Sequence, residues 1–132
     1  MERFSVHTTD RTSMMSITSH VNDAVKKSGV TNGLCYVFVP HTTAAVTINE
    51  SADPDVVEDM VMELNKVIPF QDRYLHSEGN SAAHIKTSLV GSSECIFIEN
   101  GQLMLGTWQG IFLCEFDGPR TRQIWVKTVT SE

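Results

Sequence analysis

The 132-residue chain carries 10 Lys and Arg residues against 16 Asp and Glu residues, a formal net charge of −6 at pH 7. This acidic balance argues against nucleic acid or an acidic membrane as a partner, and no apolar run approaches the roughly 18 residues of a membrane span. The 41% hydrophobic and 20% charged content excludes disorder and, at this length, predicts a single domain over residues 1–132.

Three cysteines, Cys35, Cys95 and Cys114, are odd in number, widely spaced and each within a predicted strand. This pattern predicts reduced thiols in the core and not a disulfide framework. No signal-peptide core follows Met1, so we expect the protein in the cytoplasm.

The first third of the chain predicts strands around one helix. Residues 3–8 form the first β-prone run, and the continuous apolar run 35–39 predicts a strand buried on both faces. Between them lies a helix that Ser16 caps and Gly29 ends. Its apolar side chains recur at helical spacing: Ile17, Val21, Ala24 and Val25. Residues 42–48 predict a further strand.

Two more helices follow. Asp53 is a favourable N-cap, Pro54 suits the first helical position and Pro69 ends the helix. Its apolar stripe is wide: Val56, Val57, Met60, Val61, Leu64, Val67 and Ile68. After a loop at 70–79, a third helix is expected over residues 81–89. Three of its side chains are expected to face the core: Ala82, Ile85 and Leu89.

The last forty residues predict only strands. Residues 94–99 and 102–105 flank an Asn-Gly pair, which favours a type I′ hairpin turn. Residues 111–117 and 122–129 form a second pair, and residues 111–116 are expected to be buried. Strands at both ends, without a repeating βαβ order, predict a compact α+β domain with mixed or antiparallel sheets and about three helices.

The most informative polar cluster runs from His76 to His84, where imidazoles, a carboxylate and a carboxamide meet the entrance of the third helix. Helix entrances leave backbone N–H groups unpaired and attract anions. Glu78, Gly79 and Asn80 belong to this cluster, although Asn80 also suits a simple N-cap. We interpret His76, Glu78 and His84 as candidate catalytic groups, together with His41 and Glu50 of a further cluster.

Three further clusters belong to the same hypothesis. The first joins an imidazole to hydroxyls and a carboxylate: His41, Thr42, Thr43, Asn49 and Glu50. The second lies between glycines that either permit close approach of a ligand or mark a bulge: Thr107 and Gln109. The third is a turn with two guanidiniums, Arg120 and Arg122, which suit phosphate oxygens. Together the clusters predict a site for an anionic, phosphorylated small molecule.

Other interpretations stay open for the charged residues. Glu115 and Asp117 alternate on one predicted strand face, where they either hold a divalent metal ion, perform acid–base chemistry or face solvent. Arg120 and Arg122 either bind phosphate or pair with these carboxylates. Three histidines could also bind a transition metal such as Zn²⁺: His41, His76 and His84.

Taken in order, the motifs are His41-Thr42-Thr43-Ala44-Ala45 through Asn49-Glu50, His76-x-Glu78-Gly79-Asn80-x-x-x-His84, Gly106-Thr107-Trp108-Gln109 and Asp117-Gly118-Pro119-Arg120-x-Arg122. This order resembles the YjbQ family, which is labelled secondary thiamine-phosphate synthase. The resemblance covers the whole chain, with no motif missing. It implies a compact α+β domain, a homotrimer with the motif residues near subunit boundaries, and a weak activity that joins the pyrimidine and thiazole halves of thiamine phosphate.

The resemblance implies pocket positions for eleven residues: His41, Thr43, Asn49, Glu50, His76, Glu78, Asn80, His84, Thr107, Gln109 and Arg120. The first hypothesis is a transferase that condenses hydroxymethylpyrimidine diphosphate with thiazole phosphate and releases pyrophosphate. Mg²⁺, recruited by Glu50, Glu78 or Glu115, would neutralise the diphosphate. Arg120 and the N–H groups of residues 79–81 would hold phosphate. The alternatives are a metal-dependent hydrolase of a phosphorylated metabolite and a non-enzymatic trimeric protein that binds a phosphorylated ligand.

Overall fold

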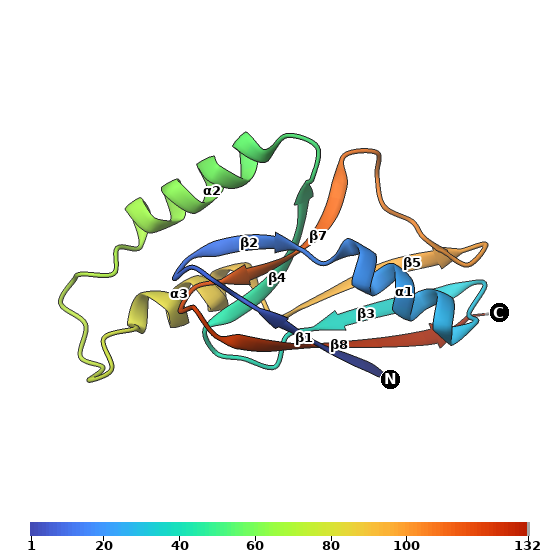
Figure 1. Ribbon diagram of the computed structural model, residues 1–132, viewed down its shortest axis with the longest axis horizontal. Helices are drawn as coiled ribbons and strands as arrows, with labels where there is room; N and C mark the ends of the chain where they lie inside the picture. The colour runs from blue at the N-terminus through green and yellow to red at the C-terminus, as the bar shows by residue number, and fades with distance from the viewer. Residues whose placement is uncertain (132) are drawn as a thin grey trace.

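Two antiparallel β-sheets pack against each other and enclose the main hydrophobic core (Figure 1). The computed structural model describes residues 1–131. The larger sheet has the strand order β1-β8-β3-β5-β6, and the smaller sheet has the order β2-β7-β4. The predicted α+β class is therefore confirmed, with three helices and antiparallel strand pairing.

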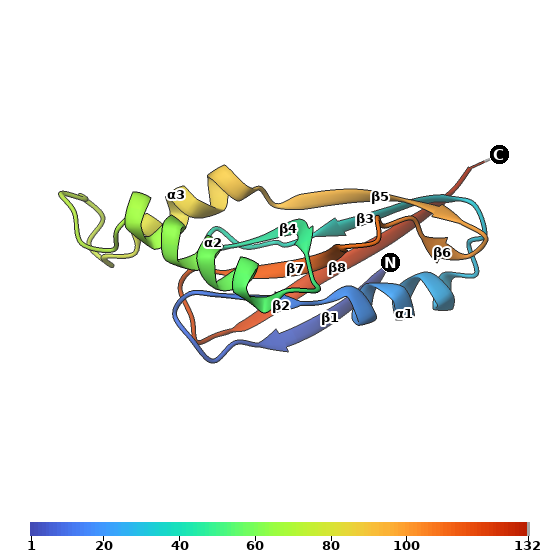
Figure 2. The ribbon, with the colours of Figure 1, turned by 90° about the horizontal axis from the view of Figure 1, so that it is seen from above.

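The strands are β1 (Glu2–His7), β2 (Ser13–Ser16), β3 (Gly33–Phe38), β4 (Ala44–Glu50), β5 (Ser93–Glu99), β6 (Gln102–Leu103), β7 (Gln109–Glu115) and β8 (Thr121–Thr130). The helices are α1 (Thr18–Ser28), α2 (Pro54–Val67) and α3 (Ser81–Val90). In both views α2 and α3 lie toward one end of the molecule, and α1 lies toward the other (Figure 2).

The two sheets differ in how far their outer faces are buried. Residues 111–116 are all buried, as predicted, because the inner face of β7 meets the larger sheet and its outer face meets α2 and α3. The prediction that residues 35–39 are buried on both faces is wrong. Cys35 and Val37 point into the core, whereas Tyr36 and Phe38 are 43% and 41% exposed. The reason is that β3 alternates in a sheet whose outer face no helix covers.

The outer face of the larger sheet is consequently rich in apolar side chains. Cross-strand neighbours place them in rows: Leu34 beside Phe97 and Val129, and Phe38 beside Trp125. The Phe38 and Trp125 rings lie 5.7 Å apart, and the Arg3 guanidinium lies over the Trp125 ring. Exposed aromatic side chains gathered on one sheet face are typical of a surface that contacts a partner.

The start of α1 differs from the prediction. Ser16 belongs to β2, a four-residue strand that pairs with β7, and Ile17 occupies the N-cap position. The segment Ser13–Ser16 is too short to display the alternation that would identify a strand in the sequence. Gly29 ends the helix in the left-handed conformation (φ 71°), as predicted.

The start of α2 follows its sequence signal. Asp53 Oδ1 accepts a hydrogen bond from Asp55 N at 2.9 Å, and Pro54 is the first helical residue. The apolar stripe packs on the outer face of the smaller sheet, against Phe112 and Phe116. No residue of α2 is fully buried, so the helix is held at the margin of the fold.

The predicted core face of α3 is confirmed at Ala82 and wrong at Ile85 and Leu89. Ile85 and Leu89 are 40% and 68% exposed, and the buried side is formed by Ala82, Ala83, Lys86 and Thr87. Small side chains lie on this side because α3 packs closely against the smaller sheet, where Ala83 and Ala45 share one cluster. This rotation of the helix leaves His84 half-buried at the surface.

Lys86 is fully buried, although no acidic side chain in the described part of the chain forms an ion pair with it. Its Nζ donates to Asn65 Oδ1 on α2 and lies 4.9 Å from the centre of the Phe70 ring. Burial lowers the pKa of the Lys86 ammonium below its usual value of 10.5. Lys86 therefore links α3 to α2, and its burial removes a charged group from water, which is unfavourable.

Lys86→Met is expected to leave the free energy of unfolding at pH 7 within about 1 kcal/mol of wild type, because it removes the buried charge and keeps the packed volume. In wild type, the unfolded chain binds the extra proton between the lowered pKa of Lys86 and 10.5, so stability rises with pH over that window. Urea denaturation at several pH values tests both points. The methionine variant should lose that rise, and an unchanged rise would contradict the assignment to Lys86.

The cysteines occupy two environments. Cys35 and Cys114 are buried, as predicted, whereas the prediction of a core position for Cys95 is wrong because its side chain is on the exposed face of β5. All three are free thiols. Burial raises the pKa of Cys35 to about 11 and that of Cys114 to about 12. In residues 1–131, none of the helices combines the length and apolarity that crossing a membrane requires.

Candidate functional site

An ion pair between the two sheets forms the floor of the candidate site. Arg122 on β8 and Glu115 on β7 are 3% and 0% exposed. Arg122 Nε donates to Glu115 Oε1 at 2.8 Å, and Arg122 Nη2 donates to Oε2. Thr8 Oγ1 adds a third hydrogen bond to the carboxylate, at 2.7 Å. The predicted pairing of Arg122 with a carboxylate is therefore confirmed, whereas its alternative role in substrate binding is wrong, as is a solvent-facing or metal-binding Glu115, because both side chains are buried and bonded to each other.

Hydrogen bonds to the Glu115 carboxylate lower its pKa and keep it ionised. Burial works to raise the pKa of this carboxyl group, but the hydrogen bonds from Arg122 and Thr8 and from the backbone of Asp117 outweigh it and leave the pKa below its usual value. Glu115 is thus an ionised group that links the smaller sheet to the larger one through Arg122. It is not an acid–base group open to a ligand.

The same ion pair supports the segment that carries His41. Arg122 Nη2 also donates to Thr43, at 2.8 Å to Oγ1 and 3.1 Å to the carbonyl oxygen. The next residue, Gln123, donates its backbone N–H to His41 Nε2 at 2.9 Å. Burial and then the positive charge of Arg122 lower the pKa of His41, so the imidazole is neutral at pH 7.

His41 and His84, 43 positions apart in the sequence, line one cavity of about 320 Å³ between the start of β4 and α3. The other lining residues are Thr42, Thr87, Ser88, Gly91 and Ser92. Hydroxyls and imidazoles supply the polar groups, and no carboxylate lines this cavity. Such a lining suits a ligand that is rich in hydrogen-bond acceptors.

His84 also borders a wider, shallower depression of about 640 Å³. His76 lies there, with its ring edge-on to the ring of His84 and the ring centres 5.6 Å apart. The remaining lining residues are Arg73, Tyr74, Leu75, Ser81 and Ile85. His84 therefore stands between two hollows, with His41 on one side and His76 on the other.

The start of α3 is tied to the turn before β8. Asn80 Nδ2 and Arg120 Nη2 donate to the same oxygen of Asp117, Oδ2, at 2.8 and 2.9 Å. Asn80 occupies the N-cap position of α3, but its side chain makes no capping hydrogen bond, so the predicted N-cap role of this side chain is wrong. Glu78 is exposed in the loop before α3, where Gly79 adopts a positive φ of 74°. These contacts bring Arg120 toward the two-histidine side of the molecule.

Four predicted residues lie at the opposite end of the smaller sheet. Glu50 pairs with Gln109 across the strands, whereas Ala44 at the other end of β4 pairs with Glu115. Six residue steps of extended chain separate the two ends by about 20 Å. Asn49 and Thr107 belong to the Glu50 end. The predicted site residues thus form two groups that one protomer does not bring together.

The predicted three-histidine metal site does not form within one protomer. Among the residues that the structure describes, no three His, Cys, Asp or Glu side chains are grouped to hold a metal ion. His41 cannot offer Nε2, because this atom accepts the Gln123 N–H. His76 and His84 remain a pair without a third ligand. The donor set therefore does not fit Zn²⁺.

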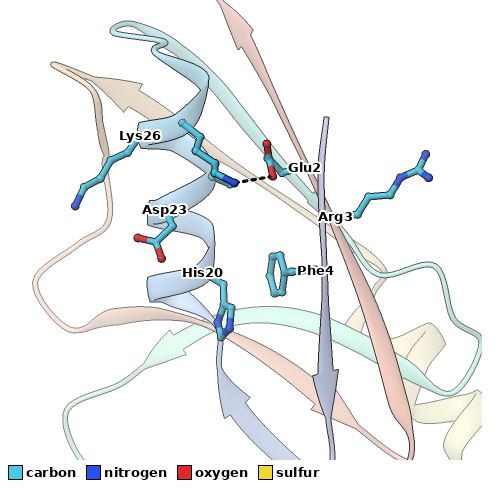
Figure 3. A pocket seen from close by; sticks show the side chains of 8 residues that line it. Glu2, Arg3, Phe4, His20, Asp23 and Lys26 are labelled. Atoms are coloured by element: carbon cyan, nitrogen blue, oxygen red, sulfur yellow. Dashed lines mark ion pairs between the residues drawn. The ribbon is translucent and has the colours of Figure 1, made fainter.

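Sequence analysis missed several residues of this region. Thr87 and Ser88 on α3 and Ser92 in the loop after it line the cavity, but isolated small hydroxyl residues carry no signal of their own. It also missed a groove of about 510 Å³ between α1 and β1, where the rings of Phe4 and His20 stack 4.7 Å apart (Figure 3). This groove lies apart from the two histidine-lined hollows and shares no lining residue with them.

The fold and the site define a two-sheet α+β protein with a cavity lined by histidines and hydroxyls. A family model described as "UPF0047 protein YjbQ-like" matches residues 2–131, and the chain belongs to this family. UPF0047 protein YugU of Bacillus subtilis is 48% identical over 130 residues, which cover 96% of this chain and 97% of YugU. UPF0047 protein MJ1081 of Methanocaldococcus jannaschii is 47% identical over 127 residues, 96% of this chain and 92% of that protein.

Solved structures agree with this assignment. The crystal structure of a YjbQ/UPF0047 family protein from Clostridium acetobutylicum matches with a TM-score of 0.96 at 53% identity, over 98% of this chain and 100% of that chain. A protein from Aeropyrum pernix matches with a TM-score of 0.94 at 36% identity, over 98% of both chains. The family resemblance inferred from the motifs is confirmed.

Proposed function

We propose that this protein is a transferase that joins hydroxymethylpyrimidine diphosphate to thiazole phosphate, giving thiamine phosphate and pyrophosphate. The observation that carries the proposal is the cavity that His41 and His84 share. Its lining offers hydroxyl and imidazole groups without a carboxylate, which suits the phosphate oxygens of either substrate. A protein of net charge −6 repels such anions unless a local site of this kind receives them.

No covalent bond between the protein and a substrate is needed in this reaction. The bond between the pyrimidine methylene carbon and the diphosphate oxygen breaks, and the oxygen keeps the electron pair. The thiazole nitrogen then donates its own pair to the methylene carbon. Catalysis therefore depends on holding both substrates in line and on neutralising the departing diphosphate. His84, which lines the cavity, is the group of this protomer that we assign to the phosphates, and Arg120, paired with Asp117, adds positive charge near it.

The predicted Mg²⁺ would assist the departing diphosphate when bound. The cavity of one protomer does not fit this ion, because hard cations prefer carboxylate oxygens and none lines the cavity. Asp117 is already shared by Asn80 and Arg120. Among the carboxylates predicted to recruit Mg²⁺, Glu115 is held by Arg122, so Glu50 and Glu78 are the ones that would bind the ion.

We further propose that the protein is a homotrimer, because its site residues lie in two groups about 20 Å apart along one sheet. In a cyclic assembly, one subunit presents its Glu50 end to the His41 end of the next. The exposed apolar face of the larger sheet supports an assembly of this kind, because Phe38, Phe97 and Val129 are exposed on it. Trp125 on that face is two residues from Gln123, which contacts His41.

Incubation of the purified protein with both thiamine halves and Mg²⁺ tests the activity. Thiamine phosphate and pyrophosphate should form in equal amounts, and His84→Ala should lower kcat at least about tenfold through the loss of a phosphate contact. Ser93→Ala, which alters an exposed strand position outside the cavity lining, is the matched control. Phosphate binding without any product would contradict the transferase and favour the non-enzymatic binding protein. Phosphate release from one substrate alone would favour the hydrolase.

A further inference from the structure

The backbone of β8 determines which nitrogen of His41 carries the proton. Gln123 N–H donates to Nε2 at 2.9 Å, and an accepting nitrogen has no hydrogen. A neutral imidazole carries one N–H, so the proton is on Nδ1. No hydrogen bond from Nδ1 to another group is made within residues 1–131. His41 therefore has one donor that the protein itself leaves unused.

The buried ion pair holds both sides of this contact. Arg122 Nη2 binds Thr43, two residues after His41, through its hydroxyl and its carbonyl oxygen. Gln123 directly follows Arg122 in β8, and Glu115 fixes the guanidinium from the opposite sheet. The chain segments that carry the imidazole and its N–H partner are thus clamped by one side chain. A shift of Arg122 would move both of them.

The cavity beside His41 points to one class of ligand. Its lining combines two imidazoles with hydroxyls and lacks any carboxylate. Thr87, which belongs to this lining, is 94% buried, and its Oγ1 has no hydrogen-bond partner among the described residues. The charges that act on His41 are those of Arg122, Glu115 and Arg120, of which Glu115 is negative. The hydroxyl and imidazole donors, with an unsatisfied hydroxyl and no carboxylate in the lining, favour an anion with several acceptor oxygens.

We propose that this cavity is the phosphate subsite, that His41 binds the phosphate as a neutral donor through Nδ1–H, and that Arg122 is the residue that positions it. The inference rests on the proposed function for the choice of a phosphorylated ligand, and it gives His41 a role different from a metal ligand or a general base. The tautomer and the clamp follow from the hydrogen bonds alone.

The test uses inorganic phosphate as the probe and the ¹⁵N-labelled full chain. Long-range ¹H–¹⁵N spectra should show His41 protonated at Nδ1 before any phosphate is added, with the signal assigned by its loss in His41→Gln. Phosphate should then shift the His41 signals in a saturable manner. His20, stacked on Phe4 in the groove beside α1, is the internal control and should not shift. A dominant Nε2–H tautomer, or equal shifts at His20, would overturn the proposal.

Two substitutions of His41 test whether the Nδ1–H donor, and not the imidazole ring as a whole, binds phosphate. An asparagine amide nitrogen lies near the place of imidazole Nδ1, whereas a glutamine amide nitrogen lies near that of Nε2. His41→Asn should therefore keep phosphate affinity within about threefold, and His41→Gln should lose about tenfold or more, as expected for one charge-assisted hydrogen bond. The opposite order would overturn the Nδ1 assignment.

Thr43→Val tests the positioning role, because it removes the hydroxyl that Arg122 binds and keeps the side-chain shape. It should introduce a second His41 tautomer and weaken phosphate binding several-fold, while wild-type far-UV circular dichroism is retained. A folded variant with a wild-type tautomer would overturn the clamp. The tautomer is measured without substrate, so failure of the thiamine assay leaves this result independent of the proposed function.

Discussion

Glu115→Gln is expected to lower the free energy of unfolding by about 3–5 kcal/mol, because it leaves the Arg122 guanidinium buried without a counter-charge. The amide keeps the shape of the carboxylate, so the loss reports charge and hydrogen bonding and not packing. Urea denaturation followed by circular dichroism measures it. Glu58→Gln, on the exposed face of α2, is the matched control and should stay within about 0.5 kcal/mol of wild type.

Removing both partners should cost less than removing one. Glu115→Leu combined with Arg122→Met replaces the ion pair by apolar groups and is expected to recover most of the stability that the single change loses. A single-variant loss below about 1 kcal/mol would mean that water reaches the guanidinium and that the pair is not a buried bridge.

The same carboxylate makes stability depend on pH. Its pKa in the folded protein lies below the usual value of 4.5, so its contribution is complete above pH 4.5 and is lost as the pH falls through the lowered pKa. Wild-type stability should therefore decline between pH 4.5 and that pKa more steeply than the stability of Glu115→Gln. Parallel declines would assign the acid sensitivity to other carboxylates.

Local signals in the sequence predict most elements of this fold. The Asp53-Pro54 start of α2 and the Gly29 end of α1 are confirmed because a cap depends only on its neighbours. The hairpin after β5 is confirmed as well, since Asn100 and Gly101 both have positive φ. These features need no knowledge of what packs against them.

Features that depend on distant partners could not be predicted in this way. Arg122 meets Thr43, 79 residues away, and Thr8 meets Glu115 across 107 residues. The sequence leaves pairing of Arg122 with Glu115 open as one interpretation, but the pattern of the strands does not indicate that this pair is buried between two sheets. The buried side of α3 depends on a distant partner in the same way. The apolar side chain of Leu89 predicts a core position from the sequence, but β4 approaches the helix so closely that small side chains face it instead.

The division of the site into two groups is the outcome with the largest consequence for function. His41 and His84 share a cavity, whereas Glu50 and Gln109 lie about 20 Å away along β4 and β7. No side-chain movement in one protomer spans that distance. A complete site of the predicted composition therefore requires a neighbouring copy of the chain.

The apolar sheet face gives a direct test of that assembly. Phe97 is 67% exposed on this face, so Phe97→Asp should leave the protomer folded and lower the mass in sedimentation from a trimer toward a monomer at micromolar concentration. Met62→Asp is the matched control, because Met62 is 58% exposed on α2 and away from this face. Dissociation by the control alone would assign the interface to α2.

Mixed assemblies test whether the two groups work together. His84→Ala and Glu50→Ala should each lower activity at least about tenfold as pure assemblies, since each removes one half of every site. After co-refolding in equal amounts, each interface has about one chance in four of joining an intact His84 to an intact Glu50, so about a quarter of wild-type activity should return. Pyrophosphate binding per subunit gives a second readout of the same fraction. Mixed trimers without recovery would contradict the shared site. Either both residues would then act within one protomer, despite the roughly 20 Å between them, or one of the two would not belong to the site.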